Sequence, residues 1–178
     1  DTDQVENKYY WTQLGDDIDG EAQDDVSGYS VSLSSGGTRV AIGATGNDGN
    51  FSNAGHVRVY EYKIPTLTEW SSGNVIKGED DDPVTDKYYW IQMGGDINGE
   101  EAYDYSGQSV SLSSDGTIVA IGADYNDGND NDGNAVIESG HVRIYQWREF
   151  TTSDSDNYHY TSRVQNTTQT KPLIITDN

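Results

Sequence analysis

Apolar and polar residues alternate along several short stretches of the chain, which is the pattern of strands that bury one face. Val31 and Leu33 lie on one face of a first stretch, and Val40 and Ile42 lie on one face of a second. The sequence Ser-Ser-Gly-Gly joins the two stretches and supplies the positive φ values that a tight hairpin turn requires. This pattern predicts two antiparallel strands joined by a short turn.

The same pattern occurs twice. Residues 8–50 align with residues 87–129 at a constant offset of 79, and 30 of the 43 aligned positions are identical. After an insertion in the second copy, the two copies end in similar segments, GHVRVY and GHVRIY, at an offset of 85. Self-similarity of this kind is the signature of a repeat protein, so the sequence predicts two modules with one fold.

An aromatic segment precedes each hairpin, KYYWTQLG at 8–15 and KYYWIQMG at 87–94. Aromatic residues favour strands, so each module is predicted to contain an aromatic strand, two hairpin strands and a final strand. The fold class that follows is all-β, with two tandem four-stranded antiparallel modules. The residues expected to be buried are Val31, Leu33, Val40, Ile42, Val57 and Val59 in the first module, and Val110, Leu112, Val119, Ile121, Val142 and Ile144 in the second.

The duplication divides the chain into four parts. The first module with its aromatic strand covers residues 1–63, a linker covers 64–86, the second module covers 87–150, and a C-terminal strand and tail cover 151–178. The linker is longer than most connections between elements, so we expect it to run over the surface.

The tail begins with a degenerate third aromatic segment, because DNYHY at 156–160 resembles DKYYW at 86–90. Two modules use two aromatic strands, so the strand at 9–14 or the one at 158–164 is left over. This strand either caps its own subunit or is exchanged with a neighbouring one, since an open sheet edge offers unpaired main-chain groups.

Composition narrows the choice of partners. Ten basic residues against 31 acidic ones give a net charge of −21, which repels nucleic acid and anionic membranes and leaves cations, glycans and other proteins. The chain has no cysteine, so there is neither a disulfide framework nor a thiolate metal site. No apolar run reaches membrane-spanning length, so we expect no membrane insertion.

The repeated segment resembles a known family. SGYSVSLSS, followed by VAIGA, an Asn-Asp-Gly loop and GHVRVYEY, resembles the FG-GAP repeat of integrin-α-type β-propellers, in the divergent form of bacterial and environmental surface proteins. The resemblance covers about residues 8–62 and 87–147 and implies blade-like sheets and an extracellular or cell-surface location. Two blades cannot close a ring, so the expected fold is an incomplete, open propeller.

Two departures from the family limit what the resemblance implies. The Phe-Gly of the family is Ser27-Gly28 in the first copy and Ser106-Gly107 in the second. The family's calcium loop between the hairpin strands is shortened to a tight turn. The family's calcium ligands are therefore not carried over to this chain.

An acidic loop with a central glycine precedes each hairpin, which makes calcium the candidate cofactor because hard cations take several oxygen ligands around a tight turn. The alternative is that these carboxylates accept hydrogen bonds from backbone amides of the turns. The candidate metal ligands are Asp17, Asp19, Glu21 and Asp25 in the first copy, and Asp96, Asn98, Glu100 and Asp104 in the second.

His56 and His141 occupy equivalent positions, and neither has a nucleophile or carboxylate at a recognisable catalytic spacing. A catalytic site is rarely copied whole into each repeat, so we expect structural roles for both and no enzymatic activity.

The remaining candidate sites concern modification and assembly. Sequons for N-glycosylation occur at Asn50 and Asn166. The aromatic residues suit a core or an interface better than a sugar site. The residues expected at subunit contacts are Tyr9, Tyr10, Trp11, Leu173, Ile174 and Ile175.

Together these features predict a non-enzymatic extracellular structural protein that self-assembles into a fibre or cell-surface layer, with terminal strand exchange as one route. The alternative is a monomeric, calcium-dependent adhesive or carbohydrate-binding module.

Overall fold

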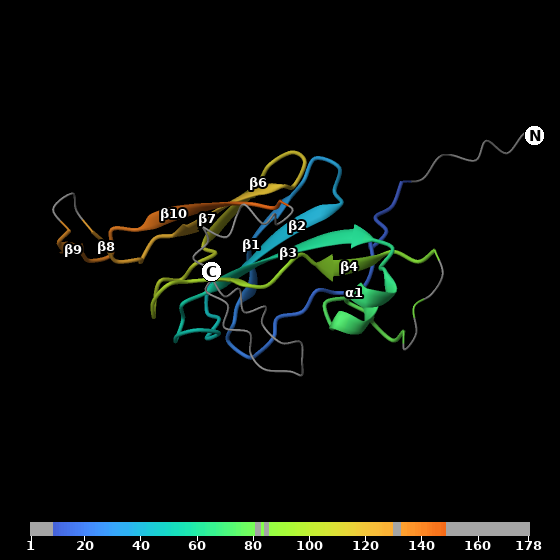
Figure 1. The fold of residues 1–178 in the computed structure, drawn as a ribbon, viewed down its shortest axis with the longest axis horizontal. Coiled ribbons are helices and arrows are strands. Elements are labelled where there is room, and N and C mark those ends of the chain that lie inside the picture. Colours follow the sequence, from blue (N-terminus) through green and yellow to red (C-terminus); the bar gives the residue numbers. More distant parts are fainter. Residues whose placement is uncertain (1–8, 81–82, 84–85, 130–132, 149–178) are drawn as a thin grey trace, which may run out of the picture. The chain divides into compact units, whose positions relative to one another are not determined.

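A computed structural model describes residues 9–80, 83, 86–129 and 133–148. These residues form ten strands and one short helix (Figure 1). The chain divides into two units, Asp1–Trp147 and Arg148–Asn178, and every strand lies in the first. The predicted all-β class is confirmed.

The larger sheet is antiparallel, with strand order β1-β2-β3-β4, and the short β5 also pairs with β3. The alternating apolar residues of the first repeat form its first three strands, and the hairpin turn between β1 and β2 contains Gly37 at a φ of 67°. The strands are β1 (Ser27–Leu33), β2 (Arg39–Ala44), β3 (His56–Lys63), β4 (Tyr89–Gln92) and β5 (Ile97–Asn98).

The smaller sheet has the order β10-β7-β6 and is also antiparallel. Its strands occupy the places of β3, β2 and β1 in the other repeat, so the duplicated sequence folds as a duplicated motif. A separate ribbon of two short strands lies in the inserted segment. The strands are β6 (Ser109–Leu112), β7 (Ile118–Ala123), β10 (His141–Gln146), β8 (Gly128–Asn129) and β9 (Ala135–Val136).

The aromatic strand β4 belongs to the second repeat by sequence, yet it completes the sheet of the first. It pairs with β3 in a register that sets Ile91 opposite Glu61 and Trp90 opposite Tyr62. The equivalent segment of the first repeat, 9–14, forms no strand with any described residue. The sequence-based prediction of a strand there is therefore wrong within this chain, because β4 already occupies the outer edge of β3, the last strand of the first repeat.

The predicted linker is folded rather than a loose surface connection. It contains the helix α1 (Leu67–Ser72), which begins with a capping box between Thr66 and Glu69. Trp70 of this helix is buried against β4, where it meets Tyr89 edge-on at 5.2 Å between ring centroids. The linker thus covers one side of the aromatic strand.

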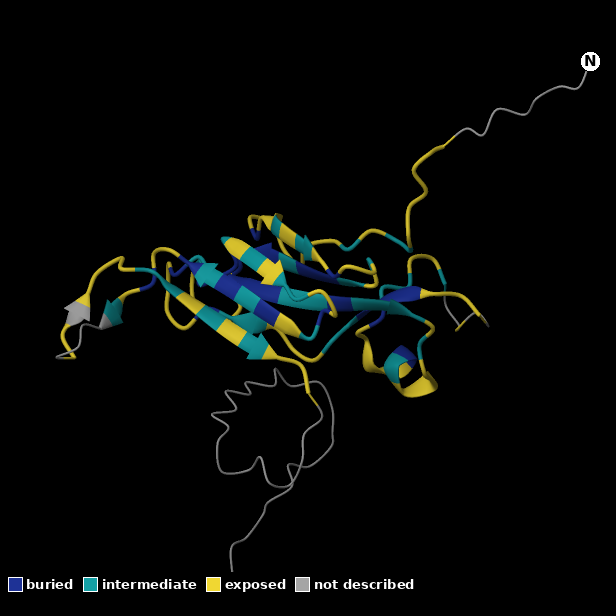
Figure 2. Ribbon diagram, turned by 90° about the horizontal axis from the view of Figure 1, so that it is seen from above, coloured by how far each residue is buried: buried dark blue, intermediate teal, exposed yellow. Residues whose placement is uncertain are grey.

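The two sheets pack face to face. Ala41 and Val57 of the first sheet contact Val119 and Ile121 of the second in one buried cluster. In Figure 2 the buried positions, in dark blue, lie mainly along the inner strands, and the outer strands carry exposed positions in yellow. This contact uses one apolar face of each module and leaves the other face of each without a second sheet. The prediction that all twelve alternating residues are buried is confirmed for four, Val40, Val57, Val119 and Ile121. Four more are partly buried, namely Ile42, Val59, Val110 and Leu112. The prediction is wrong for the last four, which are Val31 (64% exposed), Leu33 (60%), Val142 (67%) and Ile144 (70%).

Candidate functional site

The contact between the two repeats has three parts, and together they are called the internal junction here: the pairing of β4 and β5 with β3, a charged cluster around Arg58, and the packing of the two sheets. In the first part, Trp90 lies on Tyr62 at 5.1 Å between ring centroids and donates its Nε1–H to the Leu14 carbonyl at 2.7 Å. An indole placed in this way buries its apolar rings and satisfies its one donor.

Arg58 of β3 joins the repeats electrostatically. Its Nε donates to Asp96 Oδ1 at 2.7 Å and its Nη2 to Asp96 Oδ2 at 3.3 Å, while Nη2 also contacts the Glu21 carboxylate. His56, two residues away on the same face of β3, is buried with its Nδ1 4.0 Å from each carboxylate. A carboxylate from each repeat therefore converges on one arginine.

Burial and hydrogen bonding set the protonation states in this cluster. Burial favours the neutral imidazole and lowers the pKa of His56 below 6.5. Burial alone would lower the pKa of Arg58 and raise that of Asp96, but the hydrogen bonds between them outweigh it and shift both pKa values in the opposite directions. The cluster holds a neutral histidine and a fully charged arginine–carboxylate pair.

The sheet packing depends on glycines, because the backbone of the second repeat comes very close to β2. A β-carbon on Gly43 would stand 2.2 Å from the Gly107 carbonyl oxygen, which instead accepts a hydrogen bond from Ser30 Oγ at 2.6 Å. Gly55 forms a bridge with Ser106 and has a φ of 72°. The Ser106-Gly107 dipeptide is thus a docking element between the sheets.

The second repeat carries the equivalent arginine, histidine and glutamate, but one hydrogen-bond donor of the arginine lacks a carboxylate partner among the described residues. Arg143, equivalent to Arg58, donates from Nη2 to the Asn98 carbonyl at 2.7 Å and lies 3.6 Å from Glu100. His141 lies 3.6 Å from the same carboxylate. The Arg143 Nε is buried and has no hydrogen-bond partner among the described residues, whereas the Arg58 Nε is bonded to a carboxylate.

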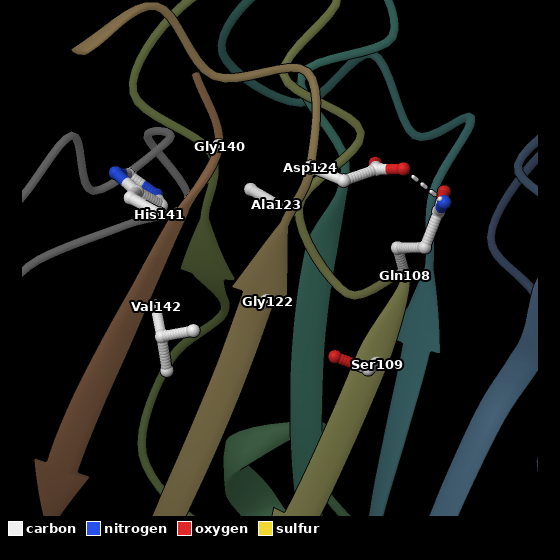
Figure 3. A pocket seen from close by; sticks show the side chains of 8 residues that line it. All are labelled: Gln108, Ser109, Gly122, Ala123, Asp124, Gly140, His141 and Val142. Atoms are coloured by element: carbon white, nitrogen blue, oxygen red, sulfur yellow. Dashed lines mark hydrogen bonds between the residues drawn. The ribbon is translucent and has the colours of Figure 1, made fainter. Parts of the chain in front are cut away.

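A pocket of about 320 Å³ lies at one end of the three-stranded sheet (Figure 3). Its walls include Ser109, Gly122 and Val142, on three neighbouring strands, and Gln108 donates a hydrogen bond to Asp124 at 2.5 Å across its edge. These lining residues are the equivalents of those that receive Ser106-Gly107 in the first repeat. The pocket is therefore the second copy of that docking surface.

A second cavity, of about 200 Å³, lies in the second repeat at the position that corresponds to the Trp90 side chain in the first. It is bounded by Met93, Gly94, Tyr145 and Trp147, among others. In the first repeat the corresponding space beside Leu14 and Gly15 is filled by the Trp90 indole.

The first repeat presents the opposite half of the junction. Gly28 is equivalent to the closely packed Gly107, and a β-carbon on Gly28 would meet nothing within 4 Å. Tyr9, Tyr10 and Trp11, equivalent to residues around β4, are 95%, 84% and 103% exposed. Within the part of the chain that the structure describes, each half of the internal junction is thus present twice and used once.

The structure brings together some of the predicted metal ligands. Ligand atoms of Glu21, His56 and Asp96 lie within 4.8 Å of one another, and Arg58 binds both of these carboxylates. Asp17 accepts a hydrogen bond from the Gln13 side chain at 2.9 Å.

The other predicted ligands lie apart from this group. Asp25 is buried and accepts from the Ala22 amide and the Asn47 side chain, and Asp104 does the same with the Glu100 and Glu101 amides and Asn126. Asp19 is exposed, and Asn98 lies in β5 opposite His56. Two of the candidate carboxylates therefore organise turns.

The predicted modification and contact sites are only partly within the described residues. Asn50 is exposed in a loop. Asn166, Leu173, Ile174 and Ile175 lie outside the described residues.

Sequence reasoning missed Arg58, Arg143 and the docking glycines. These residues recur at equivalent positions of the two repeats, and that recurrence is the signal by which the sequence could have identified them. Comparison with family models, with curated proteins and with solved structures finds no match. Among the described residues, no helix has the length and apolar character needed to cross a bilayer.

Proposed function

We propose that the protein is a non-enzymatic structural subunit that assembles with copies of itself into a fibre or cell-surface layer outside the cell. The observation that carries the proposal is the duplicated junction: the chain buries one copy of a two-sided interface and exposes the two halves of another. A two-sided contact of this kind is heterologous, and it generates open filaments whenever its rotation does not close a ring.

The exposed faces support the same conclusion. Val31 and Leu33 on one module, and Val142 and Ile144 on the other, are each more than half exposed. Contiguous apolar residues on a sheet face mark interaction sites more often than free surface. The resemblance to FG-GAP surface proteins agrees with an extracellular location, and the net charge of −21 disfavours nucleic-acid partners.

The test is the size of the particles that the 178-residue protein forms. Sedimentation and negative-stain microscopy at micromolar concentration, with and without a chelator, are expected to show polymers that persist in chelator. A monomer at every concentration would overturn the proposal. A monomer that binds a glycan only with calcium would instead support the adhesive module.

A further inference from the structure

We infer that residues 9–17 of one copy add to the free edge of β10 in a neighbouring copy, antiparallel, with Thr12 opposite Gln146 and Asp17 beside Arg143. The inference rests on the proposed function, since it names the partner as a second copy and identifies the edge that receives it.

The register follows from the duplication. Residues 9–17 are the equivalents of 88–96, of which Tyr89–Gln92 pair with β3 in this structure, and β10 is the equivalent of β3. Ile91 lies opposite Glu61 in that pairing, and the equivalents of these two residues are Thr12 and Gln146. The pairing of β4 with β3 within one chain is therefore the structural precedent for the proposed contact between two chains.

The edge of β10 is oriented to receive a strand. The Trp147 N–H donates inward to the Thr117 carbonyl at 2.7 Å, as the Tyr62 N–H does to Thr38 at 2.8 Å. Because main-chain groups alternate in direction along a strand, Gln146 directs its N–H and C=O to the outer edge. No strand of the described residues pairs with that edge.

The charged cluster supplies an independent observation. The Arg143 Nε, buried and unpartnered among the described residues, is the atom whose equivalent in Arg58 bonds to Asp96. Asp17 is the equivalent of Asp96 and is held in a matching way, because Gln13 donates to it at 2.9 Å as Gln92 donates to Asp96 at 2.7 Å. Pairing would give the orphaned donor its carboxylate.

The second repeat also has a cavity that could hold the Trp11 indole of a neighbouring copy. Trp11 is fully exposed, whereas its equivalent Trp90 is buried between Tyr62 and Leu14. The cavity bounded by Met93 and Trp147 is the equivalent space in the second repeat. Docking would bury this indole and provide its Nε1–H with the Met93 carbonyl as acceptor.

Ile18 anchors the C-terminal end of residues 9–17 on their own module, so it determines where this segment begins to extend away from the module. It packs beside Val40 and Tyr60, as Ile97 packs beside Val119 and Tyr145. A neighbouring β10 paired with this segment would therefore bring the pocket of Figure 3 to Ser27-Gly28, and the exposed face of Val142 to that of Val31.

The chain's own tail matches the edge less well. Extending the resemblance between 156–160 and 86–90 sets Ser162 at the position of Gln92 and Asn166 at that of Asp96. The tail therefore lacks the carboxylate that the buried Arg143 Nε requires, and residues 9–17 have it.

Disulfide trapping tests the register directly, because the chain has no cysteine of its own. Copies carrying Thr12→Cys are mixed with copies carrying Gln146→Cys and oxidised. A hydrogen-bonded antiparallel pair holds its Cα atoms about 5.5 Å apart, within disulfide range, so the expected product is a dimer with one copy of each variant. The matched control keeps Thr12→Cys and replaces Gln146→Cys by Leu67→Cys, an exposed position on α1 that is not part of the β10 edge, and is expected to give little product.

The outcomes separate the inference from the proposed function. Equal yields from the two mixtures, or no mixed dimer, would overturn the register. An intrachain disulfide in the double variant Gln146→Cys/Thr161→Cys would show that the tail occupies β10 and would also overturn it. Filaments without the mixed dimer would leave the proposed function standing, while mixed dimers that assemble only into closed rings would support the pairing and overturn the fibre.

The ion pair is tested by Asp17→Asn, which removes the charge but keeps the shape. Losing one partner of a buried charged pair is expected to weaken association at least about tenfold. The control is Asp24→Asn, an exposed carboxylate whose equivalent is Tyr103, and it is expected to leave association unchanged. Equal melting temperatures show that both variants fold, and equal loss of association in both would overturn the role of Asp17.

Discussion

Gly43 lies directly against Gly107, so that a β-carbon on Gly43 would stand 2.2 Å from the Gly107 carbonyl oxygen. The two residues are far apart in sequence and belong to different repeats, and their contact sets the distance between the two sheets. Backbone atoms cannot move aside as a flexible side chain does, so this position tolerates no side chain.

Gly43→Ala is therefore expected to destabilise the fold by about 1–3 kcal/mol, as overpacking in a close-packed interior does. Gly95→Ala is the control, because a β-carbon there meets nothing within 4 Å. Urea unfolding measures both free energies. A loss for Gly43→Ala no larger than that for Gly95→Ala would contradict the close approach.

Arg58→Gln is expected to lower the free energy of unfolding by about 1–3 kcal/mol, because it leaves the carboxylates of Asp96 and Glu21 facing each other without a cation. Arg143→Gln is the matched variant. Its Nε has no partner among the described residues, so its loss in the monomer is expected to be smaller. Thermal melting at low protein concentration compares them, and equal losses would contradict the asymmetry.

Trp70→Ala is expected to cost about 3–5 kcal/mol, since the indole is buried in a cluster with Val75, Tyr89 and Ile91. Leu67→Ala in the same helix is the control, because that side chain is 76% exposed and contributes within about 0.5 kcal/mol. Urea unfolding of the two variants tests whether the linker is part of the folded unit. Similar values would show that it is not.

Acid is expected to destabilise the internal junction. The pKa of His56 is lowered by burial, so the unfolded chain binds a proton there at a higher pH than the folded chain, and stability falls as the pH falls below 6.5. The pKa of Asp96 is lowered below 3.8 by Arg58 despite burial, so its stabilising contribution, present above 3.8, is lost as the pH falls further.

The measurement is the free energy of unfolding of the wild type minus that of His56→Gln across this range. Taking the difference removes the relief of charge repulsion that acid brings to a chain of charge −21. A difference that grows in favour of the wild type on acidification would contradict the assignment.

Association is expected to strengthen as salt screens the repulsion between subunits, over a Debye length of about 10 Å at 0.1 M. Divalent cations that bridge acidic loops should act more strongly than sodium chloride of equal ionic strength. Light scattering in sodium chloride, with calcium or with chelator, measures both effects. Equal assembly in low salt with chelator and in calcium would show that charge does not limit association.

The sequence alone determined the local structure of the chain. Alternation assigns the apolar residues of each strand to one face, the Ser-Ser-Gly-Gly turn closes the hairpin, and the offset of 79 residues defines two copies of one fold. These features depend on neighbours in the chain, so their pattern can be read without a structure.

Only the tertiary structure decided which sheet each aromatic segment joins and which apolar faces are covered. Strand pairing links main-chain groups that are distant in sequence. Tyr89 and Trp90 are paired in β4, whereas the equivalent Tyr10 and Trp11 are in no strand with any described residue. Val57 is fully buried and its equivalent Val142 is 67% exposed, because a second sheet covers only the first of them. Two near-identical sequences thus differ in environment solely through what packs against them.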